Sequence, residues 1–253
     1  MDLAFWDKQI NRANDLTSQA PANELLTFYA SVLSSQRDIY ESLWAANQEA
    51  DLELLGGTMP ILLKAVEQTG SQQLRNEVQQ LKASSATDVV SMLLEYLSHP
   101  SPTQFFAKAL LQPYGRWGWE SGANEIAAQV NGPEFCPFCG GRPQVSYHQF
   151  DASSESANRK LICAACLFSW PLRRGVCVNC GEESPSKLAY FQAEENDHVR
   201  VETCESCRSY IKTIDLTKLG TAMPLVDDVA TAALDLWAAE KSYTKIELNL
   251  VGL

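Results

Sequence analysis

Basic side chains and histidine are scarce in this chain of 253 residues. It holds 20 lysines and arginines against 31 aspartates and glutamates, a formal net charge of −11, and only three histidines. A chain this acidic repels phosphate backbones unless its basic residues gather in a stripe. The middle of the chain offers the only candidate stripe, without the interleaved basic and aromatic residues of nucleic-acid-binding segments. The composition therefore disfavours a nucleic-acid-binding function.

Long hydrophobic runs are also missing. The apolar stretches extend over only a few residues, whereas a helix needs about 20 apolar residues to cross a bilayer. The N-terminal segment 1–12 places Asp2 and Asp7 in its only apolar patch, unlike the basic, hydrophobic and small-residue order of a signal peptide. We therefore expect a cytoplasmic protein with no membrane span.

The sequence shows no residue pattern that is typical of an active site. It contains no glycine-rich phosphate loop, no nucleophile with an evident base, and no cluster of carboxylates with histidine. His148 and His198 fall between pairs of cysteines, and His99 lies well before them. We expect the first two in solvent-exposed hairpins and not as metal ligands. The sequence thus predicts that the protein is not an enzyme.

What the sequence does contain is four CxxC pairs. Repeated pairs of this spacing are typical of thiolate metal sites, and a cytosolic chain does not keep disulfides. Each pair makes a tight turn, called a knuckle below, that aims two sulfur atoms at one point, and two knuckles complete a tetrahedron. The predicted metal ligands are all eight cysteines: Cys136 and Cys139, Cys163 and Cys166, Cys177 and Cys180, Cys204 and Cys207.

The knuckles belong to a tandem repeat. Each cysteine of the first two pairs recurs 41 positions later, so that both halves read CxxC, 23 residues, CxxC, and Arg159 matches Arg200. Each repeat is expected to fold as a knuckle, a β-hairpin and a second knuckle. This duplication favours sequential pairing, in which the first two knuckles share one metal and the last two share another. An interleaved pairing, first knuckle with third and second with fourth, also fits the spacings.

The residue after each knuckle differs between early and late knuckles. Gly140 and Gly181 follow the first and third knuckles, where the absence of Cβ permits a sharp turn. Leu167 and Arg208 stand at the equivalent places after the second and fourth and depart from this pattern. Four thiolates in a tetrahedron suit Zn²⁺ or a single iron ion. We expect two Fe or Zn ions per chain, and both metals stay open at this point.

Helical periodicity dominates the N-terminal half. Residues 113–119 are expected to form a loop whose aromatic side chains dock the helices onto the metal-binding part, and residues 151–158 to form the first hairpin tip. A last helix over 226–241 is predicted to bury Val229, Ala233, Leu236 and Trp237. The other predicted helices, with Ser71 and Ser85 as N-caps, cover 22–47, 60–69, 72–83, 86–98 and 102–112.

These elements predict an α+β protein with an N-terminal helical domain, two tandem rubredoxin-like or zinc-ribbon modules and a C-terminal helix. The expected domains are residues 1–132 for the helices, 133–175 and 176–219 for the two ribbons, and 220–253 for the C-terminal helix and tail.

Several of these segments together resemble the formate dehydrogenase accessory protein family, FdhE type. The resemblance is carried by CPFCGGRP at 136–143, RKLICAACLFSWPLRRGVCVNCG at 159–181, CESCRSYIKTID at 204–215 and PLVDDVATAALDLWA at 224–238. It implies a cytoplasmic, non-catalytic factor that assists maturation of formate dehydrogenase, binds its catalytic subunit and holds iron in rubredoxin-like sites. All eight cysteines of the family pattern are present in this sequence.

Two other functions stay open as alternatives. A rubredoxin-like electron-transfer protein would use the same sites for redox work, and a zinc-ribbon nucleic-acid-binding module is disfavoured by the acidity. Aromatic and arginine side chains are the types that anchor protein interfaces. We therefore expect a docking surface around Trp117, Trp119, Arg173 and Arg174. The two arginines either contact a partner carboxylate there or offset the thiolate charge.

Overall fold

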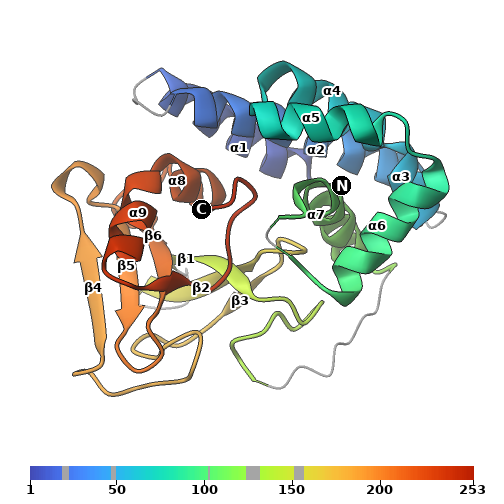
Figure 1. The fold of residues 1–253 in the computed structure, drawn as a ribbon. Helices are drawn as coiled ribbons and strands as arrows, with labels where there is room; N and C mark the ends of the chain where they lie inside the picture. Colours follow the sequence, from blue (N-terminus) through green and yellow to red (C-terminus); the bar gives the residue numbers. More distant parts are fainter. Residues whose placement is uncertain (19–22, 47–49, 102, 124–131, 151–156) are drawn as a thin grey trace. The chain divides into compact units, whose positions relative to one another are not determined.

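The computed structural model describes residues 1–18, 23–46, 50–101, 103–123, 132–150 and 157–253. They form two compact units, Met1–Glu125 with Leu250–Gly252, and Ile126–Asn249 with Leu253. The first unit is helical, and the second contains the sheet, the cysteines and the last helices, as the α+β prediction requires (Figure 1). The finer division into four domains stays a prediction. None of the helices in the described ranges has the length and apolarity that a bilayer span requires.

The helical unit is built around one long helix. Helix α2 packs against α1, α4 and α7, and its apolar stripe is buried, with Leu26, Val32 and Leu43 fully covered. The α-helices among the described residues of this unit are α1 (Leu3–Thr17), α2 (Asn23–Ala46), α3 (Leu52–Gly57), α4 (Met59–Thr69), α5 (Gln72–Leu81), α6 (Ala86–Ser98) and α7 (Phe105–Ser121). The predicted helices over 22–47, 60–69, 72–83 and 86–98 are confirmed within the described residues.

Helix starts in this unit follow from local side-chain chemistry. Ser71 caps α5 by accepting a hydrogen bond from the Leu74 amide, and Ser85 caps α6 in a capping box with Asp88. Such caps satisfy amide groups that have no partner inside the helix, and each contributes about 1 kcal/mol. Both serines were predicted as N-caps, and both are confirmed.

The predicted loop at 113–119 is wrong, because helix α7 runs through it to Ser121 with Pro113 inside. A proline lacks the amide hydrogen that would bond to the carbonyl four residues earlier, here Ala109. The buried side chain of Gln36 supplies the missing donor, since its Nε2 lies 2.9 Å from the Ala109 oxygen. Trp117 lies in this helix and is 1% exposed, so it cannot form part of an exposed docking surface.

The second unit contains one mixed sheet, in the order β3-β2-β1-β6-β5-β4, with β7 also paired to β6. Its strands are β1 (Pro143–Phe150), β2 (Ala157–Cys163), β3 (Ser169–Pro171), β4 (Leu188–Gln192), β5 (Val199–Cys204), β6 (Ser209–Asp215) and β7 (Thr244–Lys245). The pairs β1–β2 and β4–β5 are the two predicted antiparallel hairpins, one in each repeat. Most of the predicted tip at 151–158 lies outside the described residues.

The two repeats are fused by a contact that the sequence did not indicate. Strand β6 of the second repeat pairs in parallel with β1 of the first, with Ser146 opposite Thr213. The equivalent third strand of the first repeat, β3, has only three residues and ends at Pro171 on the edge of the sheet. Proline is confined to such edges because it cannot donate a ladder hydrogen bond. The two ribbons therefore form one continuous sheet.

The predicted helix over 226–241 is two shorter helices, α8 (Pro224–Ala230) and α9 (Ala232–Glu240), separated at Thr231. They lie beside β5 and β6 in Figure 1. The break shifts the buried face: Val229 is buried as predicted and Trp237 partly so, but Ala233 and Leu236 are exposed. Ala238 packs instead with Val201 and Tyr210 on one face of the sheet.

Candidate metal centres

The structure brings the eight cysteines together in two groups of four, with no disulfide among them. Within each group, the sulfur atoms lie within 4.8 Å of one another. The first group is Cys136, Cys139, Cys163 and Cys166, and the second is Cys177, Cys180, Cys204 and Cys207. The sequential grouping favoured by the repeat is therefore the one found, and the interleaved arrangement is not.

The spacing of the sulfur atoms fits a tetrahedral metal. A Zn–S bond of about 2.3 Å implies about 3.8 Å between sulfurs of a regular tetrahedron. In the first cluster Cys136 and Cys166 are 3.6 Å apart, and in the second Cys180 and Cys204 are 3.7 Å apart. A disulfide would need about 2.05 Å. Both clusters are thus sized for one metal ion of this kind.

All four knuckles share one backbone turn. Gly140 and Gly181 have φ of 73°, and Leu167 and Arg208 reach nearly the same left-handed conformation at 58° and 57°. In each knuckle the amide of this residue donates to the carbonyl of the first cysteine, as from Leu167 to Cys163 at 3.2 Å. The departure of Leu167 and Arg208 from glycine therefore changes the side chain but not the turn. At Leu167 and Arg208 the left-handed conformation strains the backbone, because both residues have a Cβ, and it costs about 1–2 kcal/mol for each residue.

Amide groups also point at the sulfurs. The Ala165 amide donates to Cys163 Sγ, and the Asn179 amide donates to Cys177 Sγ, each at 3.4 Å. Burial raises the pKa of the Cys163 thiol. Burial would likewise raise the pKa of Cys207, but hydrogen bonds from Ser209 and Asn179 outweigh it and lower this pKa to about 6. Each cluster thus contains thiols whose pKa is raised and thiols whose pKa is lowered, and a bound cation would favour the ionised form of all of them.

The clusters differ most in how far they are covered. Three of the four cysteines are buried in the first cluster, but in the second Cys204 alone is buried and Cys180 is exposed. Gly141 contributes to this closure, because a Cβ there would lie only 2.9 Å from Cys163 Sγ. Its counterpart 41 positions later is the half-buried Glu182 in the second repeat. The second cluster is therefore the more accessible to solvent.

The two matching arginines of the repeat meet at one carboxylate. Arg159 Nη2 lies 2.6 Å from Glu202 Oε2, and Arg200 Nη2 lies 2.8 Å from Glu202 Oε1. Burial disfavours the charged form of Glu202, but the two arginines outweigh it and lower its pKa. The ion pairs tie β2 of the first repeat to β5 of the second.

A second buried charge cluster was missed by sequence reasoning. Lys212 and Lys245 both contact Asp228, at 3.0 and 2.9 Å, and Asp235 contacts the same lysines. All four side chains are at most 5% exposed. The signal was present as one lysine within the apolar stretch of β6 and acidic residues within apolar α8 and α9. This cluster ties the C-terminal helices and β7 to the centre of the sheet.

Neither His148 nor His198 belongs to a cysteine cluster, as predicted. The expectation of solvent-exposed hairpin positions is wrong for His148, which is 4% exposed in β1, with Arg200 Nη2 3.1 Å from its Nε2. His198 is partly buried, and its Nε2 lies 2.9 Å from Asp227 Oδ1. His99 is exposed at the end of α6. His148 and His198 thus have side-chain contacts with other residues of the sheet unit.

This chain is similar in sequence and in structure to known proteins. The family model described as "FdhE, C-terminal domain" matches residues 176–251, which contain the whole second cluster. The "Protein FdhE homolog" of Aquifex aeolicus is 34% identical over 196 residues, covering 76% of this chain and 68% of the relative. The chain belongs to the FdhE family.

Other FdhE proteins extend the similarity along the chain. The "Protein FdhE homolog" of Haemophilus influenzae strain PittEE is 28% identical, over 97% of this chain and 87% of the relative. The crystal structure of the FdhE protein from Pseudomonas aeruginosa matches with a TM-score of 0.71 at 23% identity, over 99% of this chain and 96% of that one. At this identity the structural match establishes the shared fold.

Proposed function

We propose that this FdhE-family protein is an accessory factor for the maturation of formate dehydrogenase in the cytoplasm and binds the catalytic subunit of that enzyme. The observation that carries the proposal is the pair of complete four-cysteine clusters in an FdhE-family chain. Each cluster is proposed to hold one Fe or Zn ion through its four sulfurs. Bound there, either ion links two knuckles, and iron would add one-electron redox chemistry.

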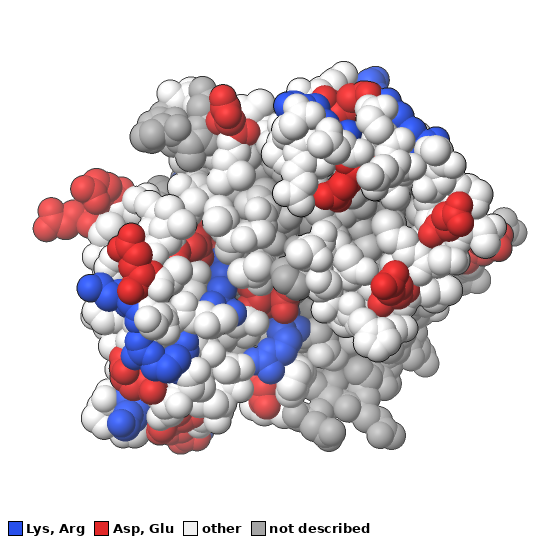
Figure 2. Space-filling model, in the orientation of Figure 1, with Lys and Arg blue, Asp and Glu red and all other residues white. Residues whose placement is uncertain are grey.

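In this proposal the protein works through its surface and not through catalysis. Arg173 and Arg174 are exposed and remain as the candidate docking residues, whereas Trp117 is buried and Trp119 is half-buried. On the face shown in Figure 2, Lys and Arg atoms lie among Asp and Glu atoms, and the described residues form no continuous basic surface there. This distribution favours a protein partner over nucleic acid.

The proposal is tested by genetics and by capture of the partner. Deleting the gene should lower active formate dehydrogenase without abolishing its synthesis, and the wild-type gene should restore the activity. An affinity pull-down from formate-grown cells should recover the catalytic subunit. Full formate dehydrogenase activity in the deletion strain, or binding of nucleic acid at physiological salt in place of the subunit, would refute the role.

The metal part of the proposal is tested on the purified protein. Metal analysis should return close to two atoms per chain, and a value near one or the spectrum of a bridged cluster would contradict it. The metals should also stabilise the sheet unit, because metal binding contributes to its folding free energy. Cys136→Ala or Cys177→Ala should make residues 132–249 sensitive to protease while the N-terminal helices stay resistant. Unchanged proteolysis would argue against this stabilising role.

A second candidate function is electron transfer through rubredoxin-like iron sites. The exposure of Cys180 favours it, because outer-sphere electron transfer needs a metal centre close to the surface. The visible absorption of the protein purified from its own host separates the two candidates. Iron that cycles reversibly between ferric and ferrous states would support electron transfer, and a colourless zinc protein would exclude it.

A further inference from the structure

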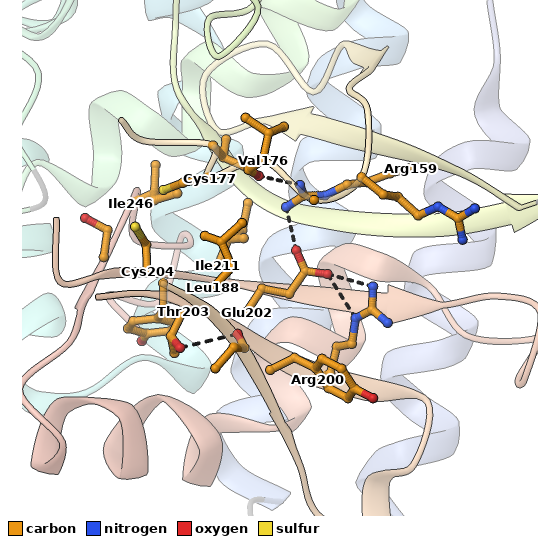
Figure 3. Close-up of a pocket in the computed structure, with 17 residues that line it drawn as sticks. Arg159, Val176, Cys177, Leu188, Arg200, Glu202, Thr203, Cys204, Ile211 and Ile246 are labelled. Carbon is orange, nitrogen blue, oxygen red and sulfur yellow. Dashed lines mark hydrogen bonds and ion pairs between the residues drawn. The ribbon is translucent and has the colours of Figure 1, made fainter. Parts of the chain in front are cut away.

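A cavity of about 220 Å³ lies within the sheet unit, beside the second cysteine cluster (Figure 3). Side chains alternate between the two faces of a strand. Val201 and Tyr210 pack with the C-terminal helices on one face, so Glu202 and Ile211 point to the other, where the cavity lies. Residues 174–178 form the opposite wall, and Cys177 and Cys204 of the second cluster are part of the lining. A ligand in this cavity would therefore lie next to two of the predicted metal ligands.

The lining combines apolar side chains with three arginines. Leu188, Ile211 and Ile246 are among its apolar members. Its charged members are three arginines, Arg159, Arg174 and Arg200, and a single acid, Glu202. Glu202 forms ion pairs with both Arg159 and Arg200, which leaves Arg174 as the arginine of the lining that has no carboxylate partner among the described residues.

Two donors at the cavity have no partner within the described parts of the chain. Arg174 is exposed and forms no ion pair there, although the adjacent Arg173 is paired with Glu183. The Arg159 side chain is 3% exposed, and its Nε is buried without a hydrogen-bond acceptor, while Nη1 and Nη2 bond to the Val176 oxygen and to Glu202. A buried donor left in this state costs about 1–3 kcal/mol. Of these two donors, Arg174 is the one that a ligand in the cavity can reach, because Arg159 Nε is fully covered.

We propose that this cavity binds a carboxylate carried on an apolar group, with Arg174 as its principal cation. A guanidinium matches the two oxygens of a carboxylate in a planar, bidentate geometry. The apolar walls would cover the group that carries it, and Glu202 in the lining disfavours anions of higher charge, such as phosphate. The carboxylate is supplied either by a free organic acid or by the C-terminus of a polypeptide. This inference goes beyond the accessory role and does not depend on it.

The test is an NMR titration of the full-length, zinc-loaded protein with matched carboxylate and amide probes. Hexanoate and an acetylated tripeptide that ends in leucine with a free carboxylate should shift the amide signals of Val176 and Leu188. Hexanamide and the same tripeptide with an amidated C-terminus should not. Tighter binding of the tripeptide than of hexanoate identifies a polypeptide as the source, and the reverse order identifies a free acid.

The neighbouring arginines supply a matched pair of variants. Arg174→Gln should weaken carboxylate binding about five-fold, the effect of losing one solvent-accessible ion pair, with the zinc content unchanged. Arg173→Gln should bind as the wild type does, because Glu183 already neutralises this arginine. Ile246→Phe should also weaken binding by filling the cavity. Equal affinity of Arg174→Gln and wild type, equal weakening by both arginine variants, or binding of the amides would overturn the proposal.

Discussion

The side-chain amide of Gln36 donates a hydrogen bond to the Ala109 carbonyl across 2.9 Å, and that carbonyl is the one that Pro113 leaves without a donor in α7. The same Nε2 lies 2.9 Å from Gln112 Oε1. Gln36 is 1% exposed, so water does not readily replace it. A residue of α2 thereby completes the hydrogen bonding of a helix more than 70 positions away.

This relationship predicts a stability effect that depends on Pro113. Gln36→Ala should lower the free energy of unfolding of the helical unit by about 1–3 kcal/mol, because the buried Ala109 oxygen loses its donor. Pro113→Ala restores an amide that can bond to this oxygen within the helix. Gln36→Ala should therefore cost less in the Pro113→Ala background, as measured by urea unfolding of the four proteins in a double-mutant cycle. Additive effects would show that the two residues are not coupled.

The unequal covering of the two clusters predicts two rates of metal release. A chelator should remove the metal of the second cluster first, because Cys180 is exposed and Cys177 and Cys207 are only partly buried. The measurement is the absorbance of a chromogenic chelator over time, with about half of the metal released in each phase. Cys180→Ser should abolish the fast phase and keep the slow one. A single phase in the wild type would show that exposure does not control release.

Gly141 provides the complementary test on the first cluster. Gly141→Ala would bring a Cβ within 2.9 Å of Cys163 Sγ and 3.2 Å of Cys139 Sγ, so it should accelerate the slow phase of metal release. Gly57→Ala is the control, because a Cβ at Gly57 meets nothing within 4 Å. If both variants release metal at the wild-type rates, the close approach at Gly141 has no influence on the cluster.

The buried charges around Asp228 predict a large loss of stability on removal of one charge. Asp228→Asn leaves Lys212 and Lys245 with Asp235 as their remaining carboxylate and should cost about 3–5 kcal/mol, because a buried charge is left uncompensated. Asp197→Asn, in an exposed pair with Lys218, should cost less than about 1 kcal/mol. Thermal unfolding of the two variants compares them directly, and similar values would mean that burial of the cluster is not important.

His148 predicts a loss of stability in mild acid. Burial, with help from Arg200, lowers the pKa of this histidine below the value of about 6.5 expected in the unfolded chain. Between the two pKa values the unfolded chain binds more protons than the folded chain does. The stabilising contribution of neutral His148 is therefore complete above about pH 6.5 and is lost as the pH falls from there through the folded-state pKa.

The measurement for His148 is urea unfolding of the sheet unit at several pH values between 7.5 and 5. His148→Gln should remove up to about 1.4 kcal/mol of pH dependence for each pH unit between the two pKa values. His99→Gln changes an exposed histidine in the other unit and should leave the curve as in the wild type. Parallel curves for His148→Gln and wild type would contradict the assignment.

Much of the architecture could be predicted because it depends on interactions between residues close in sequence. The caps at Ser71 and Ser85 satisfy amides three residues away, and each CxxC knuckle is closed by a hydrogen bond within five residues. The repeat of 41 residues supplied the remaining link, since a duplicated hairpin brings its own two knuckles together. The helices over 22–47, 60–69, 72–83 and 86–98, the two hairpins and the grouping of the cysteines followed from these patterns.

Tertiary contacts decided what the local patterns left open. Gln36 keeps α7 continuous through Pro113, although the sequence of α7 alone favours a break. The parallel pairing of β1 with β6 merges the two ribbons into one sheet, in which Lys212 is buried. Its partner Asp228 lies on α8, one of the two shorter helices found in place of the predicted helix over 226–241. The same merger brings Arg159 and Arg200 to one carboxylate at a cavity beside the second cluster. Hydrogen bonds and charges between distant segments have no periodicity along the chain, so only the folded structure brings them into view.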